Sequence, residues 1–261
     1  MGMTNTEPVV GLEGRVAVVT GASRGLGRGI AEALVARRMN VLGIARDRGR
    51  LDAWAREVQG ARALAGDAAD EALAERVVRE ERPAVLVLCA GATPAMRPFY
   101  EQTWEQMSNP WHVDTRSAFA WLKAALTVPL DPGAHVVVVS SGAAVQGSVL
   151  SGGYAGAKRM QWMLADYAAT EAKRLGRDVR ISVLLPNLNP STDLGRAGIA
   201  GYAARAGVAV EDFQERFKPF LTPEILGAAV AELCARPAAW PDLAYRATGR
   251  GLVSITDKPG G

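Results

Sequence analysis

A tyrosine and a lysine that could exchange a proton with a substrate lie four residues apart, in the pentapeptide YAGAK. They are Tyr154 and Lys158, and on a helix residues four apart project from the same face. A free phenol has a pKa of about 10, but a neighbouring ammonium favours the phenolate and lowers that pKa. The pair therefore predicts a general acid or base. Because this spacing also arises by chance, a tyrosine packed against a lysine stem is the alternative.

Two serines follow an apolar run that is typical of a buried strand. The run is HVVVVSS, and it ends at Ser140 and Ser141. The hydroxyl of Ser141 can hydrogen-bond a substrate oxygen and hold it against the hydroxyl of Tyr154. Alone, two serines after a strand are turn formers. Together with Tyr154 and Lys158, Ser141 predicts a catalytic site that acts on a carbonyl or alcohol oxygen.

A glycine-rich turn, TGASRGLG at residues 20–27, is suited to bind a pyrophosphate. It follows an apolar run at residues 16–20 and opens a helix, whose N-terminus presents unpaired N–H groups and a partial positive charge. Glycine also lets the backbone approach a ligand closely. Its spacing is GxxxGxG and not GxGxxG, and a glycine cluster alone is a weak signal. The residues expected to contact a cofactor here are Gly21, Ser23, Arg24, Gly25, Leu26 and Gly27.

The end of the second predicted strand bears on the kind of dinucleotide. An acidic residue there accepts hydrogen bonds from a ribose 2′-hydroxyl, whereas arginine suits a 2′-phosphate. The strand ends at Arg46, with no carboxylate until Asp47, and Arg24 lies within the glycine turn. Two guanidinium groups can bind a phosphate with paired hydrogen bonds. We therefore expect NADP(H) in preference to NAD(H), the alternative being that both arginines are merely solvated.

The elements that must position these residues alternate along the chain. Strands are predicted at residues 16–20, 41–45, 63–65, 84–90, 135–140, 180–185 and 251–255, and helices at 29–38, 51–59, 69–81, 113–128, 153–175 and 224–235. This alternation predicts an α/β fold, with a doubly wound parallel sheet of Rossmann type and helices on both faces. No internal repeat or linker interrupts it, so residues 11–261 are expected to form a single domain after a flexible N-terminus at residues 1–10.

Residues 187–220 are the one long stretch without a predicted element. They follow the carboxyl end of a strand, where ligands bind in such sheets. We expect a mobile lid over the substrate, and a plain surface excursion is the alternative.

Composition excludes several classes of protein. The chain has 261 residues and a formal net charge of +3, with no dense basic run, so we expect no nucleic-acid partner. Its two cysteines form no CxxC or Cys/His cluster, which argues against a metal site and suits a reducing compartment. No signal peptide and no apolar run of about 20 residues is present. We expect a cytoplasmic protein without a membrane partner.

In combination, these motifs resemble those of the short-chain dehydrogenase/reductase family. The glycine turn, the serines at a strand end, and YAGAK beginning thirteen residues after Ser141 occur in the family's order and spacing. The similarity extends from residue 15 to about residue 255. It implies a Rossmann-type sheet of about seven strands, assembled as a homotetramer or homodimer through its long helices.

The resemblance also implies roles for individual residues. Tyr154 is expected to be the acid or base, Lys158 to lower its pKa and hold the nicotinamide ribose, and Ser141 to orient the substrate carbonyl. Asp67 matches the family's adenine-contacting aspartate. The remaining cofactor contacts that the resemblance implies are Ala90, Gly91, Pro186, Ser191 and Thr192, and the spacing leaves open which hydroxyl contacts the carboxamide.

The chain departs from the family pattern at several places. The family's NAG segment has Cys89 in place of its asparagine, a change we interpret as structural. The helix asparagine of the catalytic tetrad appears as Asp114. Since the asparagine mainly supplies a backbone carbonyl to a water, activity is expected to survive, although an added charge can perturb Lys158. SNPWH at residues 108–112 looks like a small insertion before that helix, and Asn187 replaces a glycine after Pro186.

These residues together predict an NADP(H)-dependent oxidoreductase. A hydride would move between nicotinamide and a ketone or aldehyde, or a secondary alcohol, and reduction is the favoured direction. Two other functions stay open: a non-catalytic nucleotide-binding sensor that kept the fold, and an isomerase or lyase that uses the same residues.

Overall fold

The strands form because apolar side chains alternate between the two faces of the sheet, and a layer of helices packs against each face. A computed structural model describes residues 10–255. In β1 (Val16–Thr20), Ala17 and Val19 pack into one hydrophobic core and Val18 into another, as the two-residue period of a strand requires. Both faces of the sheet are covered, so its strands are apolar nearly throughout. The predicted N-terminal segment 1–10 lies outside the described residues except for Val10, whose N–H donates to Ala235 O at 2.7 Å.

Within residues 10–255 the strands form one sheet in the order β3-β2-β1-β4-β5-β6-β7-β8. All neighbours are parallel except β7 and β8, which pair antiparallel at the edge. The predicted doubly wound sheet is thereby confirmed, with an eighth strand added. The unpredicted strand β7 is short and mixed in character, AYRAT. The strands are β1 (Val16–Thr20), β2 (Asn40–Ala45), β3 (Ala61–Ala65), β4 (Val85–Leu88), β5 (Ala134–Val139), β6 (Val179–Pro186), β7 (Ala244–Thr248) and β8 (Gly251–Ser254).

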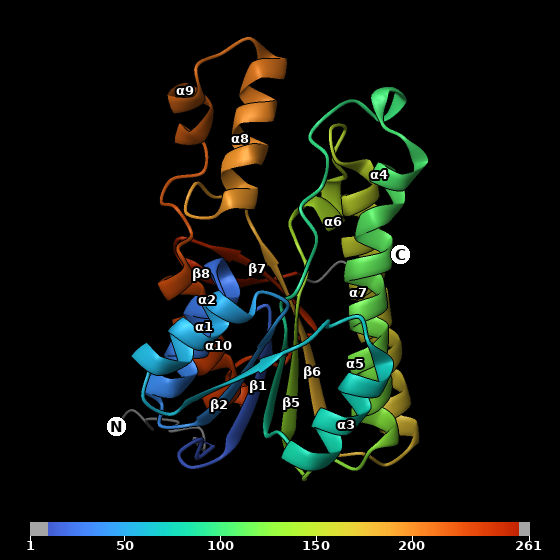
Figure 1. The fold of residues 1–261 in the computed structure, drawn as a ribbon, viewed down its shortest axis with the longest axis vertical. Helices are drawn as coiled ribbons and strands as arrows, with labels where there is room; N and C mark the ends of the chain where they lie inside the picture. Colours follow the sequence, from blue (N-terminus) through green and yellow to red (C-terminus); the bar gives the residue numbers. More distant parts are fainter. Residues whose placement is uncertain (1–9, 256–261) are drawn as a thin grey trace, which may run out of the picture.

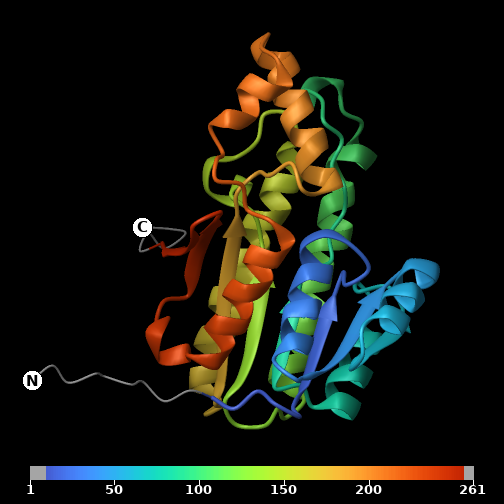
Figure 2. The same cartoon turned by 90° about the vertical axis from the view of Figure 1, so that its left-hand side faces the viewer.

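Helices cover both faces of this sheet (Figures 1 and 2). Helices α1 (Gly25–Ala36), α2 (Arg48–Glu57) and α10 (Pro223–Ala235) share one core with the sheet, and α3 (Glu71–Glu81), α5 (Arg116–Thr127) and α7 (Gly152–Arg174) share the other. Trp54 on α2 and Trp121 on α5 are 0% exposed and anchor the two cores. Each such ring removes roughly 150–250 Å² from water, which contributes about 4–6 kcal/mol before entropy is counted.

The helix predicted at residues 113–128 begins earlier than expected. Helix α4 (Trp104–Pro110) runs directly into a π-helical turn (Trp111–Thr115) and then into α5. The segment SNPWH therefore lies inside a continuous helical run and not before it. Pro110 has no N–H and interrupts the regular hydrogen-bond ladder, and π turns occur inside helices at such irregularities. The π turn holds Asp114 facing the sheet, where its side chain is fully buried.

Residues 187–220 are not irregular, in contrast to the prediction. They contain α8 (Asp193–Ala206), which Thr192 caps by accepting from Gly195 N, and α9 (Val210–Glu215). Helix α8 is rich in glycine and alanine and lacks a clear apolar stripe, so no periodicity revealed it. Both helices rise beyond the carboxyl edge of the sheet, opposite α4 and α6 (Ala143–Gln146) (Figure 1). The two remaining short helices are single 3₁₀ turns at Phe99–Glu101 and Pro237–Ala239.

Candidate active site

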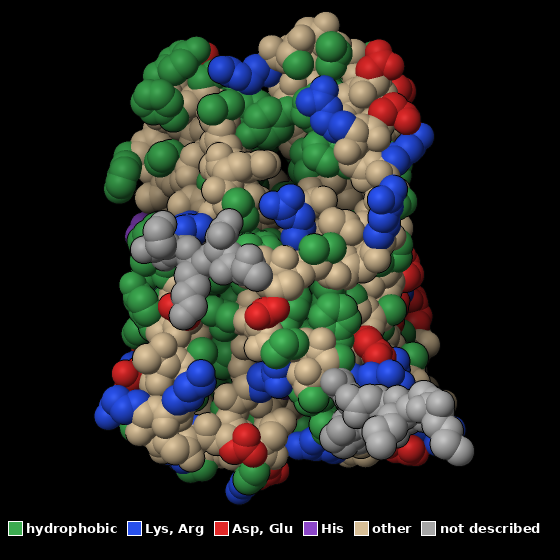
Figure 3. Space-filling view, turned by 180° about the vertical axis from the view of Figure 1, so that it is seen from behind, with side chains coloured by type: hydrophobic (Ala, Val, Ile, Leu, Met, Phe, Trp, Pro, Cys, Tyr) green, Lys and Arg blue, Asp and Glu red, His purple; other side chains and the backbone are tan. Residues whose placement is uncertain are grey.

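A large cavity lies where the parallel strands end at their carboxyl edge. Its volume is about 1030 Å³, at the upper limit of ordinary ligand pockets. Figure 3 shows the molecule hollowed between its two upper lobes. All the residues predicted as catalytic or cofactor-binding line this cavity: Gly21, Ser23, Arg24, Gly25, Leu26, Gly27, Arg46, Asp67, Ala90, Gly91, Asp114, Ser141, Tyr154, Lys158, Pro186, Ser191 and Thr192.

The glycine turn approaches its neighbours too closely for a side chain. Gly21 has a φ of +74°, and a Cβ there would lie 2.9 Å from Ala90 N. A Cβ on Gly27 would lie 2.3 Å from Gly21 O. Helix α1 begins at Gly25 with no acidic residue in its first turn, so no carboxylate of its own first turn competes for its N-terminal N–H groups. The turn thus fits the pyrophosphate of a dinucleotide by shape and by partial charge.

Thr20 connects this turn to the neighbouring strand, a role that sequence reasoning missed. Its Oγ1 accepts hydrogen bonds from Cys89 N at 3.0 Å and Ala90 N at 3.2 Å. These contacts join the ends of β1 and β4 at the crevice where the strand order reverses. Cys89, which replaces the family asparagine, lines the cavity, and burial raises the pKa of its thiol to about 11. The only signal for Thr20 was a polar residue ending an apolar strand.

The two arginines predicted to recognise a 2′-phosphate have different surroundings. Arg24 Nη1 lies 2.6 Å from Asp193 Oδ2 on α8, whereas Arg46 has no ion-pair partner among residues 10–255. Asp67, predicted to contact adenine, lines the same end of the cavity and accepts a hydrogen bond from Ala69 N at 2.9 Å. In this arrangement Arg46 is the freer of the two guanidinium groups.

The two serines that follow β5 have different surroundings: Ser140 is structural and Ser141 faces the cavity. Ser140 is buried, and its hydroxyl donates to Lys158 O at 2.7 Å, which attaches β5 to helix α7. Ser141 lines the cavity, and its Oγ accepts from Ala143 N at 3.2 Å. Ser141 lies close enough to Tyr154 to lower the pKa of the phenol. The structure therefore brings together the hydroxyl and the phenol that the sequence placed in one site.

Tyr154 is nearly enclosed, with 8% of its surface exposed, and Lys158 Nζ lies 5.5 Å from its ring centroid. Burial raises the pKa of Tyr154, Lys158 lowers it, and Asp114 raises it again, so that the net direction is upward. The expectation of a lowered pKa is therefore wrong for the unliganded protein. The lysine acts in the expected direction, but the cost of desolvating a phenolate outweighs it.

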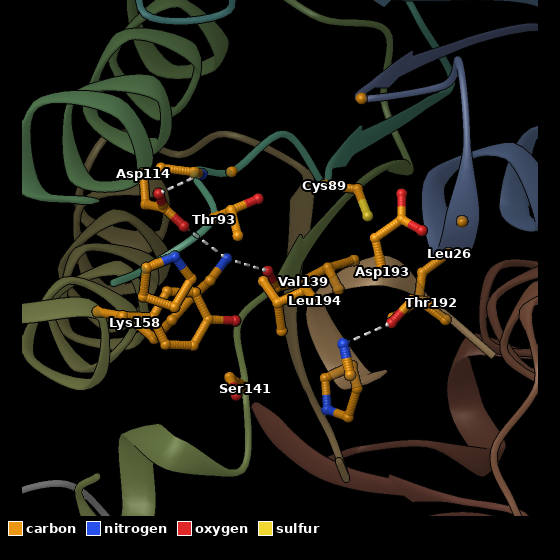
Figure 4. Close-up of a pocket in the computed structure, with 18 of the residues that line it drawn as sticks. Leu26, Cys89, Thr93, Asp114, Val139, Ser141, Lys158, Thr192, Asp193 and Leu194 are labelled. Atoms are coloured by element: carbon orange, nitrogen blue, oxygen red, sulfur yellow. Dashed lines mark hydrogen bonds and ion pairs between the residues drawn. The ribbon is translucent and has the colours of Figure 1, made fainter. Parts of the chain in front are cut away.

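Lys158 is held from several sides (Figure 4). Its ammonium donates to Val139 O at 3.2 Å and lies 3.0 Å from Asp114 Oδ1. It also donates to Gln161 Oε1 at 3.1 Å, which is not drawn in the figure. Burial lowers the pKa of Lys158, but the charge of Asp114 and the neighbouring Tyr154 more than offset it, so the pKa is raised. The lysine is therefore charged, and its charge is compensated within 3.0 Å.

Asp114 occupies a place built for an acceptor. Its Oδ2 accepts from Ala92 N at 2.8 Å, and its backbone carbonyl accepts from Gln161 Nε2 at 2.9 Å. A Cβ on Gly91 would lie 2.7 Å from Oδ1, so the glycine makes room for this carboxylate. Sequence reasoning missed Gln161, although it stands seven residues after Tyr154 and three after Lys158, on the same helix face.

Helix α8 contributes side chains to the lining of the cavity. The hydroxyl of Tyr202 on α8 hydrogen-bonds with Ser148, which in turn hydrogen-bonds with Ser151 before helix α7. Phe213 on α9 stacks on Tyr202 with ring centroids 6.2 Å apart. This part of the cavity thus combines aromatic surface with hydroxyl groups.

Two further observations describe the part of the chain between residues 10 and 255. No group of three or more histidine, cysteine or acidic side chains there could hold a metal ion. No helix there is both long and apolar enough to cross a membrane.

Comparison with known proteins identifies relatives. The sequence pattern of the family described as short chain dehydrogenase matches residues 15–198. D-erythrulose reductase of Gallus gallus is 30% identical over 193 residues, which cover 73% of this chain and 77% of that enzyme. L-xylulose reductase of Cavia porcellus is 35% identical over 108 residues, so the match spans 41% of this chain and only 44% of that enzyme's length.

Solved structures share the fold. A 3-ketoacyl-(acyl-carrier-protein) reductase from Brucella melitensis, complexed with NADH, has a TM-score of 0.73 at 21% identity and covers 89% of this chain and 96% of its own. A short-chain dehydrogenase/reductase from the same organism, described as glucose/ribitol dehydrogenase, has a TM-score of 0.74 at 24% identity, with coverage of 92% and 97%.

Proposed function

Because the chain belongs to the short-chain dehydrogenase/reductase family, we propose that it is an NADP(H)-dependent oxidoreductase that acts on a ketone or aldehyde, or on the corresponding secondary alcohol. The observation that carries this proposal is the convergence of Ser141, Tyr154 and Lys158 on one cavity beside the glycine turn. Two of the relatives are named as reductases of sugars, xylulose and erythrulose. We therefore propose a small polar carbonyl compound as the substrate.

Each residue of the site would contribute one part of the reaction. A bound nicotinamide supplies the hydride for reduction, or accepts it for oxidation. Ser141 and Tyr154 both donate hydrogen bonds to the carbonyl oxygen, which polarises the carbonyl. The phenolic proton of Tyr154 passes to that oxygen, and Lys158 stabilises the phenolate that remains. A proton from solvent then restores the phenol, so the net change is one hydride and one proton added to the carbonyl.

The preference for NADP(H) over NAD(H) is supported by the same charges that predicted it. Arg46 stands at the adenosine end of the cavity without an acidic partner among the described residues, and Arg24 lies across from it. Assembly as a homodimer or homotetramer is supported by apolar side chains on the outer face of α5 and α7. Phe119 and Tyr167 there are 43% and 52% exposed, and light scattering on a gel-filtration column would measure the subunit number.

Replacing Tyr154 by phenylalanine tests the proposed function. Purified protein would be mixed with NADPH and a panel of ketoses and simple ketones, and cofactor absorbance and product would both be followed. The wild type should oxidise NADPH, and Tyr154→Phe should lose roughly 10²–10⁴-fold in turnover, because a general acid contributes about that much. Cofactor affinity, measured by fluorescence titration, should stay nearly unchanged, since the lost hydroxyl contacts the substrate.

Three outcomes would point elsewhere. Retained turnover in Tyr154→Phe would mean that the acid is misassigned. Tight NADPH binding without turnover on any carbonyl compound would favour a sensor. Product formed with no net change in cofactor absorbance would favour an isomerase or lyase.

A further inference from the structure

Four polar groups around Lys158 form a closed network with almost no exposure to solvent. Ala92 N donates to Asp114 Oδ2, Asp114 Oδ1 lies against Lys158 Nζ, Lys158 donates to Gln161 Oε1, and Gln161 Nε2 donates to the Asp114 backbone carbonyl. Exposure is 0% for Asp114, 1% for Gln161 and 4% for Lys158. Each member thus restrains the next, and Lys158 has little freedom to move independently.

The network requires a carboxylate at position 114. Ala92 N–H and the Lys158 ammonium are both donors, and they face the two different oxygens of Asp114. An asparagine has one amide oxygen and can accept from only one of these groups, so the other would meet an NH₂ group. The aspartate is therefore the side chain of this shape that serves both donors, and Gly91 leaves room for its Oδ1.

The network also changes the charge that surrounds Tyr154. The ionisable groups facing the phenol are Lys158 on its own helix, Asp114 on the π turn and Cys89 beyond β4. The carboxylate 3.0 Å from the ammonium carries the opposite charge, so it offsets part of the effect of Lys158 on the phenol. Lys158 lowers the pKa of Tyr154, and Asp114 raises it by a smaller amount.

We propose that Asp114 is a positioning residue: its carboxylate compensates part of the Lys158 charge, while Gln161 holds the ammonium in place, so that Tyr154 keeps its proton until a carbonyl oxygen takes it. This inference rests on the proposed function for its meaning in catalysis. The phenolic O–H breaks as the new O–H of the product alcohol forms, while the hydride of the reduced cofactor reaches the carbonyl carbon.

An ultraviolet titration of the unliganded protein tests the inference without cofactor or substrate. The chain contains five tyrosines, so the phenolate absorbance of Tyr154 is obtained by subtracting the titration of Tyr154→Phe. In the wild type the midpoint should lie above about 10, the value of a free tyrosine. In Asp114→Asn it should fall by at least about one pH unit, because one nearby negative charge is removed and Lys158 is left uncompensated.

Two further variants separate charge from packing. Gln161→Leu breaks the network but removes no charge, so it should move the midpoint much less than Asp114→Asn does. Asp166→Asn removes one negative charge elsewhere on α7, at a residue without an ion-pair partner among residues 10–255, and should leave the midpoint unchanged. An equal fall in either variant would overturn the role of the Asp114 charge.

A wild-type midpoint below about 10 would refute the inference even if Asp114→Asn does not fold. The titration does not depend on the proposed function, because it measures the phenol of Tyr154 even if no carbonyl compound is reduced. If reduction is observed and the midpoint does not respond to Asp114→Asn, only the role of Asp114 is lost.

Discussion

Two ion pairs connect distant parts of the chain at the same cavity, with similar lengths and opposite surroundings. Lys158 Nζ lies 3.0 Å from Asp114 Oδ1, and Arg24 Nη1 lies 2.6 Å from Asp193 Oδ2. The side chains of the first pair are 5% and 0% exposed, whereas both side chains of the second are 56% exposed. The shorter pair is thus the one in water, where screening leaves it weak.

The two pairs differ less in how strongly their charges attract than in what happens when one partner is removed. In the buried pair, loss of either partner leaves a charge without solvent or counter-charge. In the exposed pair, water replaces the lost partner at little cost, so Arg24 and Asp193 are free to exchange partners. We therefore propose that the buried pair governs the protonation of Tyr154, while the exposed pair can respond to a bound anion.

The largest effect should come from removing one charge of the buried pair. Lys158→Met should lower the free energy of unfolding by about 3–5 kcal/mol, because Asp114 stays buried and uncompensated. Arg24→Ala, the matched change in the exposed pair, should cost no more than about 1 kcal/mol. Urea unfolding followed by circular dichroism measures both.

A double variant sharpens this test. Asp114→Asn combined with Lys158→Met removes both charges and should be more stable than Lys158→Met alone, since no unpaired charge remains. Equal losses for Lys158→Met and Arg24→Ala would contradict the claim that burial separates the two pairs.

The two histidines of the chain offer the same contrast in a pH dependence. His135 is buried on β5 with its Nε2 3.0 Å from Ser182 Oγ, whereas His112 is exposed. Burial lowers the pKa of His135 to about 3. Above pH 6.5 both the folded and the unfolded states hold a neutral His135, and below it only the unfolded chain takes up the proton.

Stability should therefore fall as the pH drops from about 6.5 towards 3, by up to roughly 1.4 kcal/mol per pH unit from this residue. Unfolding measured across this range should flatten in His135→Gln relative to the wild type, whereas the control His112→Gln should keep the full slope. An unchanged slope in His135→Gln would show that other groups cause the acid sensitivity.

Much of the fold was predictable because burial on both faces leaves a strong pattern. The run VAVVT at β1 is apolar up to its last residue, Thr20, the run HVVVV in β5 is apolar after His135, and the glycine turn marks where β1 ends. Helix α8 left no such pattern, because it packs against few neighbours and is built of small residues. The π turn was equally hidden, since Pro110 is compatible with a helix start as well as with a helical irregularity.

The candidate site was predictable as a set of residues but not as an arrangement. Tyr154, Lys158 and Ser141 were found from their spacing, and Asp114 from its place in a family pattern. The contacts of Gln161 depend on how the π turn rotates the Asp114 carbonyl towards α7. The net direction of the Tyr154 pKa depends on burial, which spacing alone does not reveal.

Substitutions in the exposed Arg24–Asp193 pair should have the smallest effect on stability. Their measurable effect should be on the relative affinities for NADPH and NADH. Arg46→Ala should weaken NADPH by about tenfold or more relative to NADH, because a charged hydrogen bond to phosphate is lost. Arg24→Ala should have a smaller effect, since Asp193 already holds that guanidinium. Asp193→Asn should cost less than about 1 kcal/mol of stability.

Asp193→Asn gives the most direct test of partner exchange. Released from its carboxylate, Arg24 becomes available to a 2′-phosphate, so NADPH affinity should rise while NADH affinity stays the same. Asp131→Asn provides a control, because Asp131 pairs with Arg82 and does not line the cavity. If both cofactors gained equally in Asp193→Asn, the charge of Asp193 would act on the pyrophosphate and not through Arg24, and the exposed pair would carry no specificity.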